Sequence, residues 1–399
     1  MKVIVCQHGS RLEYAIPRML EAVGSLAALY TDSSTYSFLG KAAKISKPFI
    51  WSRWFRLLQR RAEGIPRERV FSTDRPLLSD LWAALVLPGE DWFDANLRRH
   101  RVLSKQMIRW GLKNADAIYV QNIDDYDFVR YAKGNKKKVI MDVNSSPIYH
   151  KLLVEEYSRY QKWGHPPDRS IIERREAHFK RTAGLADILL CPSEWVREGV
   201  TRLTPEHAGK IRICPYGSRI DFAGQTNHPV SGRIVFAGGH ALMKGLPDLA
   251  KAADILKQKY PQMDFRIAGL LDAKIQKMSE SRSLNFLGRL SRGRMQGEYL
   301  AADMFVLPTR SEGLAGVVLE AIAAGCPVIT TKRAGINITH GIDGILVPPG
   351  EVDALVGAIE EVYRDREYRN TLASHTRTLA IHYTLDAWEK RLLDILQEL

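Results

Sequence analysis

The chain has 399 residues, of which 45% are hydrophobic and 26% are charged. Such a composition can build full hydrophobic cores, which excludes disorder over the whole chain, and the length predicts two domains. The net charge of +13 predicts an acidic partner, namely nucleic acid, an anionic lipid surface or an anionic substrate.

The chain start, MKVIVCQHGS, predicts a short strand and not a signal peptide, because the apolar run is brief and lacks a cleavage region. No segment approaches the roughly 18–20 continuous apolar residues of a membrane span. The four cysteines are scattered without metal-ligand spacing, and they are Cys6, Cys191, Cys214 and Cys326. We therefore expect reduced, mostly buried thiols in a cytoplasmic protein that is soluble or peripheral on the inner face of a membrane.

The first predicted strand, over 2–6, leads through a loop containing His8 and Gly9 into a helix from Tyr14 to Val23. A strand, a glycine loop and a helix can cradle a phosphate, which makes Gly9 a candidate ligand-binding residue. A single glycine also fits an ordinary strand-to-helix turn, so both interpretations stay open. A second strand is predicted over 25–30.

Residues 41–69 are strongly basic, with nine Lys/Arg against Glu63 and Glu68, a net charge of +7. Trp51, Trp54 and other apolar side chains alternate with the arginines, a pattern typical of a helix on an anionic membrane. A solvated wrapping segment and a nucleic-acid contact are the alternatives, and we expect no nucleic acid. A second basic run, 97–113, has a helical apolar stripe, so we expect it to pack on the first sheet and expose a basic face.

Two further strands are predicted over 117–120 and 139–141. Asp125-Tyr126-Asp127 fits a metal-binding Asp-x-Asp pattern, but an Asp-rich helix N-terminus is the favoured explanation, and we predict no metal site. Asp142 ends the second of these strands, and His150 follows nearby. A helix over 170–183, a strand over 186–193 and a strand over 211–217 complete the first half, and Ser193 is a predicted helix N-cap.

The second half opens with a strand over 233–237, the loop Gly238-Gly239-His240, and Lys244 just before a helix from about Pro247. A lysine at the end of such a loop supplies a point charge for a diphosphate. Strands over 264–269 and 284–290 follow. Arg289 lies in the second of these strands, and Arg292 and Arg294 follow it.

The segment with the most specific pattern is PTRSEGLAGVVLEAIAAGCP, residues 308–327. The apolar run 304–307 predicts a buried strand, and a helix is predicted over 314–324 before a strand over 328–330. Unpaired N–H groups at a helix start bind phosphate, and Gly313, Ala315 and Gly316 allow close approach.

Glu312 and Glu320 lie eight residues apart, about two helical turns on one side. Two carboxylates flanking phosphate-binding amides suit a diphosphate that joins two hydroxyl-bearing rings, which is the shape of a nucleotide sugar. A capping Glu and a solvated Glu on an ordinary helix are the alternative interpretation.

The run SEGLAGVVLEAIAAGCPVI resembles the E-x7-E region of retaining nucleotide-sugar glycosyltransferases of the GT-B fold, of the family 4 type. The resemblance implies that Glu312 contacts the transferred sugar, that Glu320 holds the ribose hydroxyls, and that the amides of Leu314–Gly316 hold the distal phosphate. The family often has an aromatic-Gly pair after the first Glu, whereas this chain has Leu314-Ala315. Sugar preference therefore need not follow the family.

The resemblance also implies roles elsewhere in the chain. The family commonly places an Arg about five residues before Lys244, where this chain has Gly239 and His240, so His240 is a candidate substitute. Relatives often have a His after the strand that here ends at Asp142, which makes Asp142 or His150 a candidate acceptor contact. In the family the first loop, here with Gly9, faces the donor phosphates or the acceptor, and Gly238 and Gly239 fall in a donor-binding region. Residues after Leu290 line the base pocket in the family, so the resemblance implies Arg289, Arg292 or Arg294 as a base contact, and the sequence does not select among them.

These features predict an α/β chain of the GT-B fold, with two Rossmann-like, doubly wound domains facing a cleft. The expected boundaries are 1–215 for the acceptor domain, 216–380 for the donor domain and 381–399 for a last helix packed back on the first domain. The resemblance implies a UDP- or GDP-linked sugar as the donor, without metal or cofactor. It also implies that Lys244 and helix amides stabilise the leaving diphosphate, which would help to deprotonate the acceptor.

We expect the acceptor to be a lipid-linked compound or an oligosaccharide, as in cell-surface polysaccharide synthesis, and we expect 41–69 with 97–113 to face an anionic membrane. Two alternatives belong to other classes. One is a GT-B epimerase or hydrolase that acts on the nucleotide sugar itself. The other is a non-catalytic basic protein that binds membrane or nucleic acid.

Overall fold

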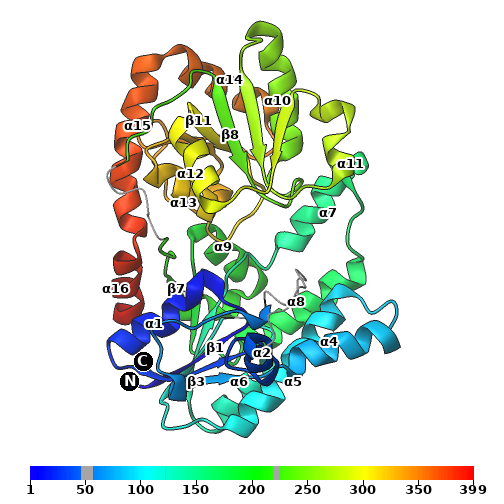
Figure 1. Ribbon diagram of the computed structural model, residues 1–399, viewed down its shortest axis with the longest axis vertical. Coiled ribbons are helices and arrows are strands. Elements are labelled where there is room, and N and C mark those ends of the chain that lie inside the picture. Colours follow the sequence, from blue (N-terminus) through cyan, green and yellow to red (C-terminus); the bar gives the residue numbers. More distant parts are fainter. Residues whose placement is uncertain (46–56, 122, 219–224) are drawn as a thin grey trace.

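The computed structural model describes residues 1–45, 57–121, 123–218 and 225–399, and its described strands form two parallel sheets in two domains (Figure 1). The first sheet has the order β3-β2-β1-β4-β5-β6-β7, and its strands are β1 (Val3–Gln7), β2 (Leu26–Thr31), β3 (Val70–Ser72), β4 (Ala117–Val120), β5 (Lys138–Asp142), β6 (Ile188–Cys191) and β7 (Ile211–Ile213). The second has the order β10-β9-β8-β11-β12-β13, with β8 (Arg233–Ala237), β9 (Asp264–Ala268), β10 (Leu284–Gly288), β11 (Met304–Leu307), β12 (Val328–Thr330) and β13 (Ile345–Leu346).

Both sheets have the strand order of a doubly wound fold. The order reverses between β1 and β4 in the first domain and between β8 and β11 in the second. At such a switch point the loops that follow two adjacent strands diverge, and this opens a crevice at the carboxyl ends of the strands. The two Rossmann-like domains expected from the sequence are confirmed.

Helices cover both faces of each sheet, which is why the strands are apolar without alternation. All five residues of β1 are buried, and so are all four of β11. The first-domain helices are α1 (Ala15–Ala22), α2 (Phe38–Ile45), α4 (Arg75–Val86), α5 (Trp92–Trp110), α6 (Tyr126–Gly134), α7 (Tyr149–Arg159), α8 (Arg169–Ala183) and α9 (Glu194–Leu203). The second-domain helices are α10 (Leu246–Lys259), α11 (Ala273–Gln276), α12 (Arg292–Ala301), α13 (Gly316–Ala323), α14 (Val352–Arg364) and α15 (Arg366–Ala380).

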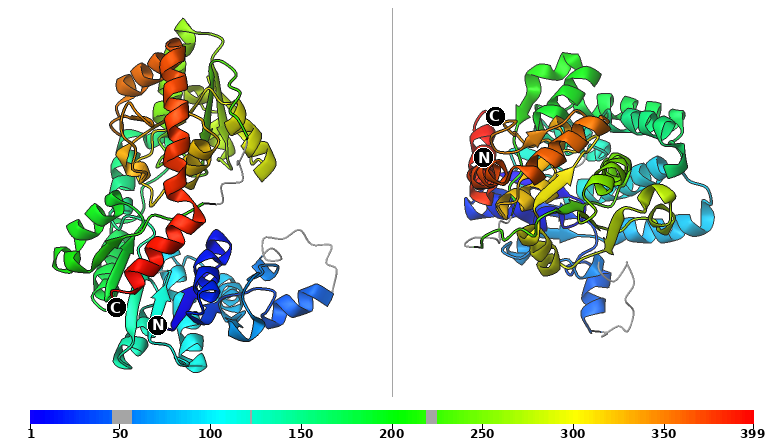
Figure 2. Two further views of the ribbon diagram at one scale, coloured as in Figure 1. Left: turned by 90° about the vertical axis from the view of Figure 1, so that its left-hand side faces the viewer. Right: turned by 90° about the horizontal axis from the view of Figure 1, so that it is seen from above.

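The last helix, α16 (Leu385–Leu396), returns to the first domain, as the sequence predicted (Figure 2). Its buried residues Trp388, Leu392, Ile395 and Leu396 belong to the core cluster that contains Val3 and Val5 of β1. The chain that leaves the first domain after β7 lies beside α16, because Tyr216 packs edge-on against Trp388 with ring centroids 5.5 Å apart. Two crossing segments therefore join the domains side by side.

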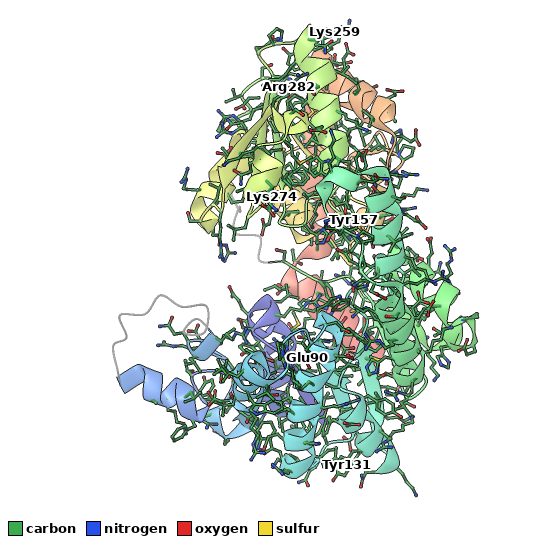
Figure 3. The ribbon with its side chains drawn as sticks, turned by 90° about the vertical axis from the view of Figure 1, so that its right-hand side faces the viewer. Glu90, Tyr131, Tyr157, Lys259, Lys274 and Arg282 are labelled. Carbon is green, nitrogen blue, oxygen red and sulfur yellow. The ribbon has the colours of Figure 1, made fainter. Side chains whose placement is uncertain are left out.

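Helix α7 is a further link between the two domains, which the sequence did not predict. It belongs to the first half of the chain, but its Leu153 packs with Leu242 and Met243 of the second domain. In Figure 3, Tyr157 of this helix lies at the level of the second domain, whereas Glu90 and Tyr131 lie in the first. The loop after β8 is thus covered by a helix from the other domain.

Several predicted elements coincide with the observed ones, including β4, β11 and β12. The last strand of the second sheet is short, Ile345–Leu346, and Pro348 and Pro349, which follow it, lack the N–H that a ladder needs. All four cysteines are free and buried, as expected. In the described part of the chain, no helix combines the length and apolar character needed to cross a membrane.

The basic segment 41–69 lies partly outside the described residues, which include neither Trp51 nor Trp54. In its described part the arginines make internal contacts: Arg60 pairs with Asp32 at 3.1 Å and Arg69 bonds Glu21. Two arginines of this segment are therefore paired within the protein. In the second run, α5 packs Leu103 and Met107 into the core, while Arg101, Lys105 and Arg109 are exposed.

Candidate active site

The loops after β5 and β6 of the first domain meet those after β11 and β12 of the second. Ser193 donates its hydroxyl hydrogen to the Gly313 carbonyl at 2.7 Å, and Trp195 Nε1 donates to Ser311 Oγ at 3.0 Å. A Cβ on Gly313 would lie 1.9 Å from the Asn144 carbonyl oxygen, so only glycine permits this approach. The carboxyl ends of both sheets therefore face each other, and the second domain's switch point opens toward the first domain.

Glu312 and Lys244, both predicted site residues, form an ion pair at this switch point. Lys244 comes from the loop after β8 and Glu312 from the loop after β11, and their side chains are only 19% and 17% exposed. Thr309 bonds the Glu312 carboxylate at 3.3 Å, and the Glu312 N–H donates to the Arg333 carbonyl at 2.9 Å. The pair is thus held from two sides.

The backbone of the glycine loop before Lys244 packs closely against the Lys244 side chain. A Cβ on Gly238 would lie 3.1 Å from Lys244 Cγ, whereas Gly239 and His240 are exposed. Desolvation of one side of the His240 ring, together with the Lys244 ammonium, lowers its pKa. We therefore expect His240 to be neutral at pH 7, so it does not supply a second positive charge there.

Helix α13 begins at Gly316, two residues later than predicted. The Ala315 N–H donates to the Ala334 carbonyl at 2.9 Å, so in this structure that amide is already used. Leu314 packs against the first-domain core. The helix start that remains for an anion is formed by Gly316 and Val317, whose N–H groups precede the intrahelical ladder.

Glu320 lies down the same helix and is half-buried. Its carboxylate accepts a hydrogen bond from the Tyr299 hydroxyl at 2.9 Å. Burial raises the pKa of Glu320, while Tyr299 and the nearby Arg292 oppose that shift. Of the three candidate arginines, Arg292 is therefore the one beside Glu320, and Arg289 is exposed in the loop after β10.

Asp142, a predicted acceptor contact, lies in a buried network at the interdomain segment. The Tyr216 hydroxyl donates to its Oδ1 at 2.5 Å, and burial raises the pKa of Asp142 against the opposing effect of Arg11. With Asn144 it lines a small cavity of about 40 Å³. His150 stacks on Trp92 with centroids 5.0 Å apart.

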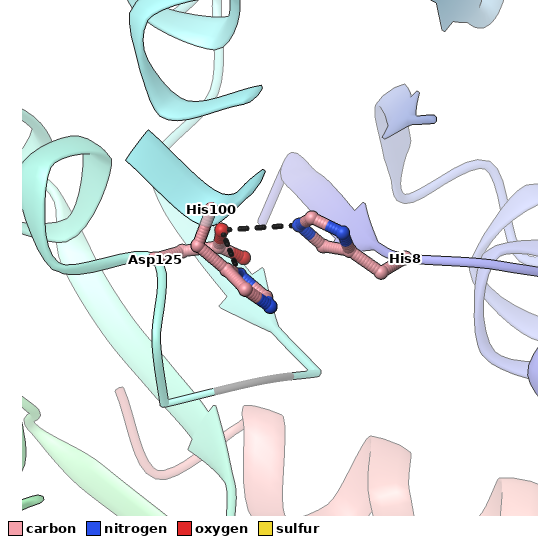
Figure 4. Close-up of side chains that lie close together, drawn as sticks. All are labelled: His8, His100 and Asp125. Carbon is pink, nitrogen blue, oxygen red and sulfur yellow. Dashed lines mark hydrogen bonds and ion pairs between the residues drawn. The ribbon is translucent and has the colours of Figure 1, made fainter. Parts of the chain in front are cut away.

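Gly9 takes a positive φ of 72°, and its N–H donates to Asp32 Oδ1 at 2.9 Å. Its neighbour His8 belongs to a group that sequence reasoning did not assemble. His8 and His100 both contact Asp125 Oδ1, at 3.2 and 2.7 Å (Figure 4). These three side chains are also of kinds that ligate metal ions. Asp125 precedes α6, as an acidic helix start predicts, but its side chain does not cap the helix.

Sequence reasoning also missed Arg310, which is 1% exposed although it adjoins the site. Its guanidinium pairs with Glu156 of α7 at 2.7 Å and with Asp248 of α10 at 2.5 Å. Tyr149, also on α7, lies close enough for Glu312 to contribute, after burial, to a raised pKa of its hydroxyl. Only the packing of α7 against the second domain brings these groups to the site.

Behind this loop, both domains line a cavity of about 880 Å³. First-domain residues Ser193 and Trp195 face Arg333, Ile336 and Tyr383 across it. Arg333 lies over the Trp195 ring, 4.8 Å from its centroid. Ligand-sized space therefore exists between the domains beside the Glu312 loop.

Comparison with known proteins agrees with this geometry. Residues 222–379 match the family model of the glycosyl transferases group 1. The D-inositol 3-phosphate glycosyltransferase of Corynebacterium urealyticum is 27% identical over 242 residues, which cover 54% of this chain and 57% of that protein. TuaC of Bacillus subtilis, named for teichuronic acid biosynthesis, is 27% identical over 205 residues, covering 49% of this chain and 51% of TuaC. The chain thus matches about half the length of these relatives.

Solved structures are similar over the whole chain. Sucrose-phosphate synthase from Thermosynechococcus elongatus superposes with a TM-score of 0.70 at 18% identity, covering 100% of this chain and 99% of that one. Anabaena HepE, solved in complex with UDP, gives 0.65 at 15% identity, with both chains covered completely. Residues 222–379 are thus similar to the group 1 glycosyl transferases, and the solved neighbours show that the whole chain has the GT-B fold.

Proposed function

We propose that the protein is a retaining glycosyltransferase of the family 4 type that transfers a sugar from a nucleotide-diphosphate sugar to a lipid-linked or saccharide acceptor. The C-terminal domain (216–380) binds a UDP- or GDP-linked donor, and the N-terminal domain (1–215) binds the acceptor. The HepE structures, which include a complex with UDP-glucose, support a nucleotide sugar as the donor.

The observation that carries this proposal is the Lys244–Glu312 ion pair at the second switch point, beside the start of α13. Without a ligand, each group neutralises the other. On this proposal a bound diphosphate replaces Glu312 as the partner of Lys244, and Glu312 then bonds a hydroxyl of the transferred sugar. Lys244 and the helix N-terminus stabilise the leaving diphosphate, so no metal ion is required.

Glu320 completes the donor site in this proposal. About one helical turn from the first residue of α13, it is placed to accept hydrogen bonds from ribose hydroxyls, and Tyr299 orients its carboxylate. Arg292 lies beside it, where a guanidinium can contact the base. The proposed donor thus spans α13 from its first turn to Glu320.

A thermal-unfolding screen with UDP-, GDP- and ADP-linked sugars tests the donor site. At a concentration of about 100 times Kd, a ligand stabilises the folded protein by about 2.7 kcal/mol. We expect one donor class to raise Tm, and Glu320→Ala to lose that shift. Glu361→Ala, an exposed change on α14, serves as the matched control. If no donor stabilises the wild type, or if Glu320→Ala responds like the wild type, the proposed site is wrong.

We further propose that the acceptor side docks on an anionic membrane from the cytoplasmic face, as in cell-surface polysaccharide synthesis. Helix α4 exposes a continuous apolar face, which we call the α4 apolar face: Leu78, Leu81, Trp82, Leu85 and Val86. Leu85 is 84% exposed. The helix packs on α5 through Arg98, which bonds Ser79 and Asp80, and α5 exposes Arg101, Lys105 and Arg109. Apolar and basic surfaces in one helical pair fit an anionic bilayer.

Vesicle co-sedimentation tests this docking. We expect the wild type to bind phosphatidylglycerol-containing vesicles and Trp82→Glu/Leu85→Glu to bind at least about tenfold more weakly, since burying one leucine contributes about 1.5–3 kcal/mol. Ile255→Glu, at a 46% exposed position of α10, should bind like the wild type. Equal binding by all three proteins would remove the α4 apolar face from the proposal.

A further inference from the structure

The cavity of about 880 Å³ between the domains, which we call the interdomain cavity, is separate from the proposed donor site. Its walls come from both domains, with Pro215 and Trp195 on one side and Tyr383 on the other. Neither Lys244 nor Glu312 is among the residues that line it. Small-molecule sites have volumes of roughly 300–1,000 Å³ and occur often at domain interfaces, so the cavity has the size and the place of a second ligand site.

A half-buried cation without a carboxylate partner faces this cavity. Among the described residues Arg333 forms no ion pair, and its guanidinium lies over the Trp195 ring, 4.8 Å from the centroid. Burial, followed by the charge of Arg310, lowers the pKa of Arg333, although Glu155 and Glu156 oppose that shift. The positive charge of Arg333 is therefore incompletely compensated within the protein, and an anion bound in the cavity would compensate it.

The other charged groups of the lining leave this positive character in place. Lys332 adjoins Arg333 and is exposed, with no ion pair in the described part of the chain. Of the acidic lining residues, Glu194 pairs with Arg197, and Glu198 is exposed to solvent. Arg333 is thus the charged lining residue that solvent screens least, so its charge dominates the inner part of the cavity.

The remainder of the lining is largely apolar. It contains a flat aromatic surface, the indole of Trp195, and aliphatic side chains from both domains, which are Ile213, Pro215, Ile336, Ile338 and Val347. Apolar walls with a few charged groups are typical of sites for small organic molecules. They favour a ligand with a compact, uncharged body and one ionised group over a free inorganic ion, because the body displaces water from the apolar walls.

Two lining residues are also bonded to the loop that carries Glu312. The Arg333 carbonyl accepts a hydrogen bond from the Glu312 N–H at 2.9 Å, and Trp195 Nε1 donates to Ser311 Oγ at 3.0 Å. The residues that a ligand in the interdomain cavity would contact therefore also hold the loop of the proposed donor site.

We propose that the interdomain cavity binds a small organic anion, a phosphate ester or a carboxylate with a ring-sized uncharged body, and that this anion regulates donor binding. Arg333 and Lys332 bind the anionic group, and the body packs on Trp195 and the aliphatic walls. The regulatory part of the proposal rests on the proposed function, whereas the binding site itself does not.

Occupation of the cavity should weaken donor binding. A ligand that contacts walls from both domains stabilises their present separation, in which Lys244 is paired with Glu312. In the proposed function the donor takes Lys244 from Glu312, and the cleft closes to exclude water. The two ligands then favour different states, so by linkage each raises the Kd of the other by the same factor.

Binding is tested with the full chain and four probes: phenyl phosphate, benzoate, benzyl alcohol and inorganic phosphate. The first two carry an anion on a ring, whereas the others lack the charge or the ring. The indole N–H signal of Trp195, identified by its loss in Trp195→Phe, reports on the cavity in nitrogen-15 spectra. We expect phenyl phosphate or benzoate to shift it with a Kd at least about tenfold lower than the other two, as for one charge-assisted hydrogen bond. The tighter of these two anions separates a phosphate-ester ligand from a carboxylate.

Substitution of Arg333 tests which group binds the anion. We expect Arg333→Met to raise the Kd of the anionic probe by at least about tenfold, and Arg333→Lys to retain part of the affinity. Arg202→Met, at an exposed position near the other end of α9, should bind like the wild type. Thermal unfolding shows whether each variant is folded.

Regulation is tested by measuring the donor Kd in each protein with increasing probe. We expect the probe to raise the donor Kd of the wild type by about 5–150-fold and then to reach a plateau, with a much smaller ratio in Arg333→Met. The ratio within one protein cancels any direct effect of the substitution on donor affinity. In the wild type alone, saturating donor should raise the probe Kd by the same factor, a measurement that needs no variant.

Each part of the proposal has a result that overturns it. Absence of a shift in the Trp195 signal with both anionic probes would remove the site, and equal affinity for benzyl alcohol would remove its anionic character. A donor Kd that is unchanged, lower or rising without a plateau would overturn the regulation, because a rise without limit means competition within the donor site. If no nucleotide sugar binds the wild type while the anionic probes do, the proposed function fails and the cavity remains a binding site.

Discussion

Replacing Lys244 with Met is expected to lower the turnover number for sugar transfer by about 10²–10³-fold, comparable to the loss of one oxyanion-stabilising donor. In the proposed reaction the leaving diphosphate gains charge as the bond to the anomeric carbon breaks. Lys244 supplies a fixed positive charge in a site where its side chain is 19% exposed. Such a charge acts more strongly there than in water, because less solvent screens it.

The measurement is steady-state release of the nucleoside diphosphate at varied donor concentration. We expect turnover to fall more than donor affinity, since the interaction strengthens in the transition state. Lys244→Arg should retain part of the rate, and Lys257→Met on the same loop-helix unit should behave like the wild type. An unchanged turnover in Lys244→Met would mean that another cation, or a metal ion, stabilises the diphosphate.

Arg310→Met is expected to destabilise the protein by about 3–5 kcal/mol, as for other buried pairs that lose one partner. The substitution removes a guanidinium that is 1% exposed, which leaves Asp248 buried without its ion-pair partner and, among the described residues, Glu156 with only the exposed Arg159, at 3.8 Å. Tyr160 would still bond Asp248, at 2.5 Å, but a hydroxyl does not neutralise a carboxylate. Because Glu156 belongs to α7 and Asp248 to α10, the change also weakens the link between the two domains.

Urea or thermal unfolding measures this effect, with Arg169→Met as the control. Arg169 also pairs with a glutamate at 3.0 Å, but its side chain is 92% exposed, so we expect a loss of about 0–1 kcal/mol. A similar small loss for Arg310→Met would show that the buried network contributes little. A triple change of Arg310, Glu156 and Asp248 to apolar residues should recover part of the stability, since no uncompensated charge then remains.

The fold could be read from the sequence because its signals are local. The runs 117–120 and 304–307 are continuous apolar segments, and each forms the strand predicted for it. Ser193 was a predicted N-cap, and its hydroxyl accepts from the Val196 N–H. Alternation of such strands with helices defines a doubly wound domain, since parallel strands need crossover helices.

The residues of the proposed donor site could also be picked out from the sequence. Lys244, Glu312 and Glu320 occur in short segments with a helix start between the two carboxylates, although Glu312 lies in the loop before α13 and not on the same helix as Glu320. The structure adds that Lys244 and Glu312 pair, that Tyr299 holds Glu320 and that the Ala315 amide is occupied. Those partners come from other strands and helices, where spacing along the chain carries no information.

The sequence by itself therefore determined the two-domain α/β architecture, the returning C-terminal helix and the residues of the expected donor site. Only the tertiary structure decided which distant groups meet: His8 with His100 and Asp125, and Arg310 with Glu156 and Asp248. In the sequence, His8 is a loop histidine, His100 is a histidine in a basic helix, and Asp125 is an aspartate at a helix start. Their chemistry arises from burial and from contacts between distant segments, which depend on how the sheets order their strands and how α7 crosses to the second domain.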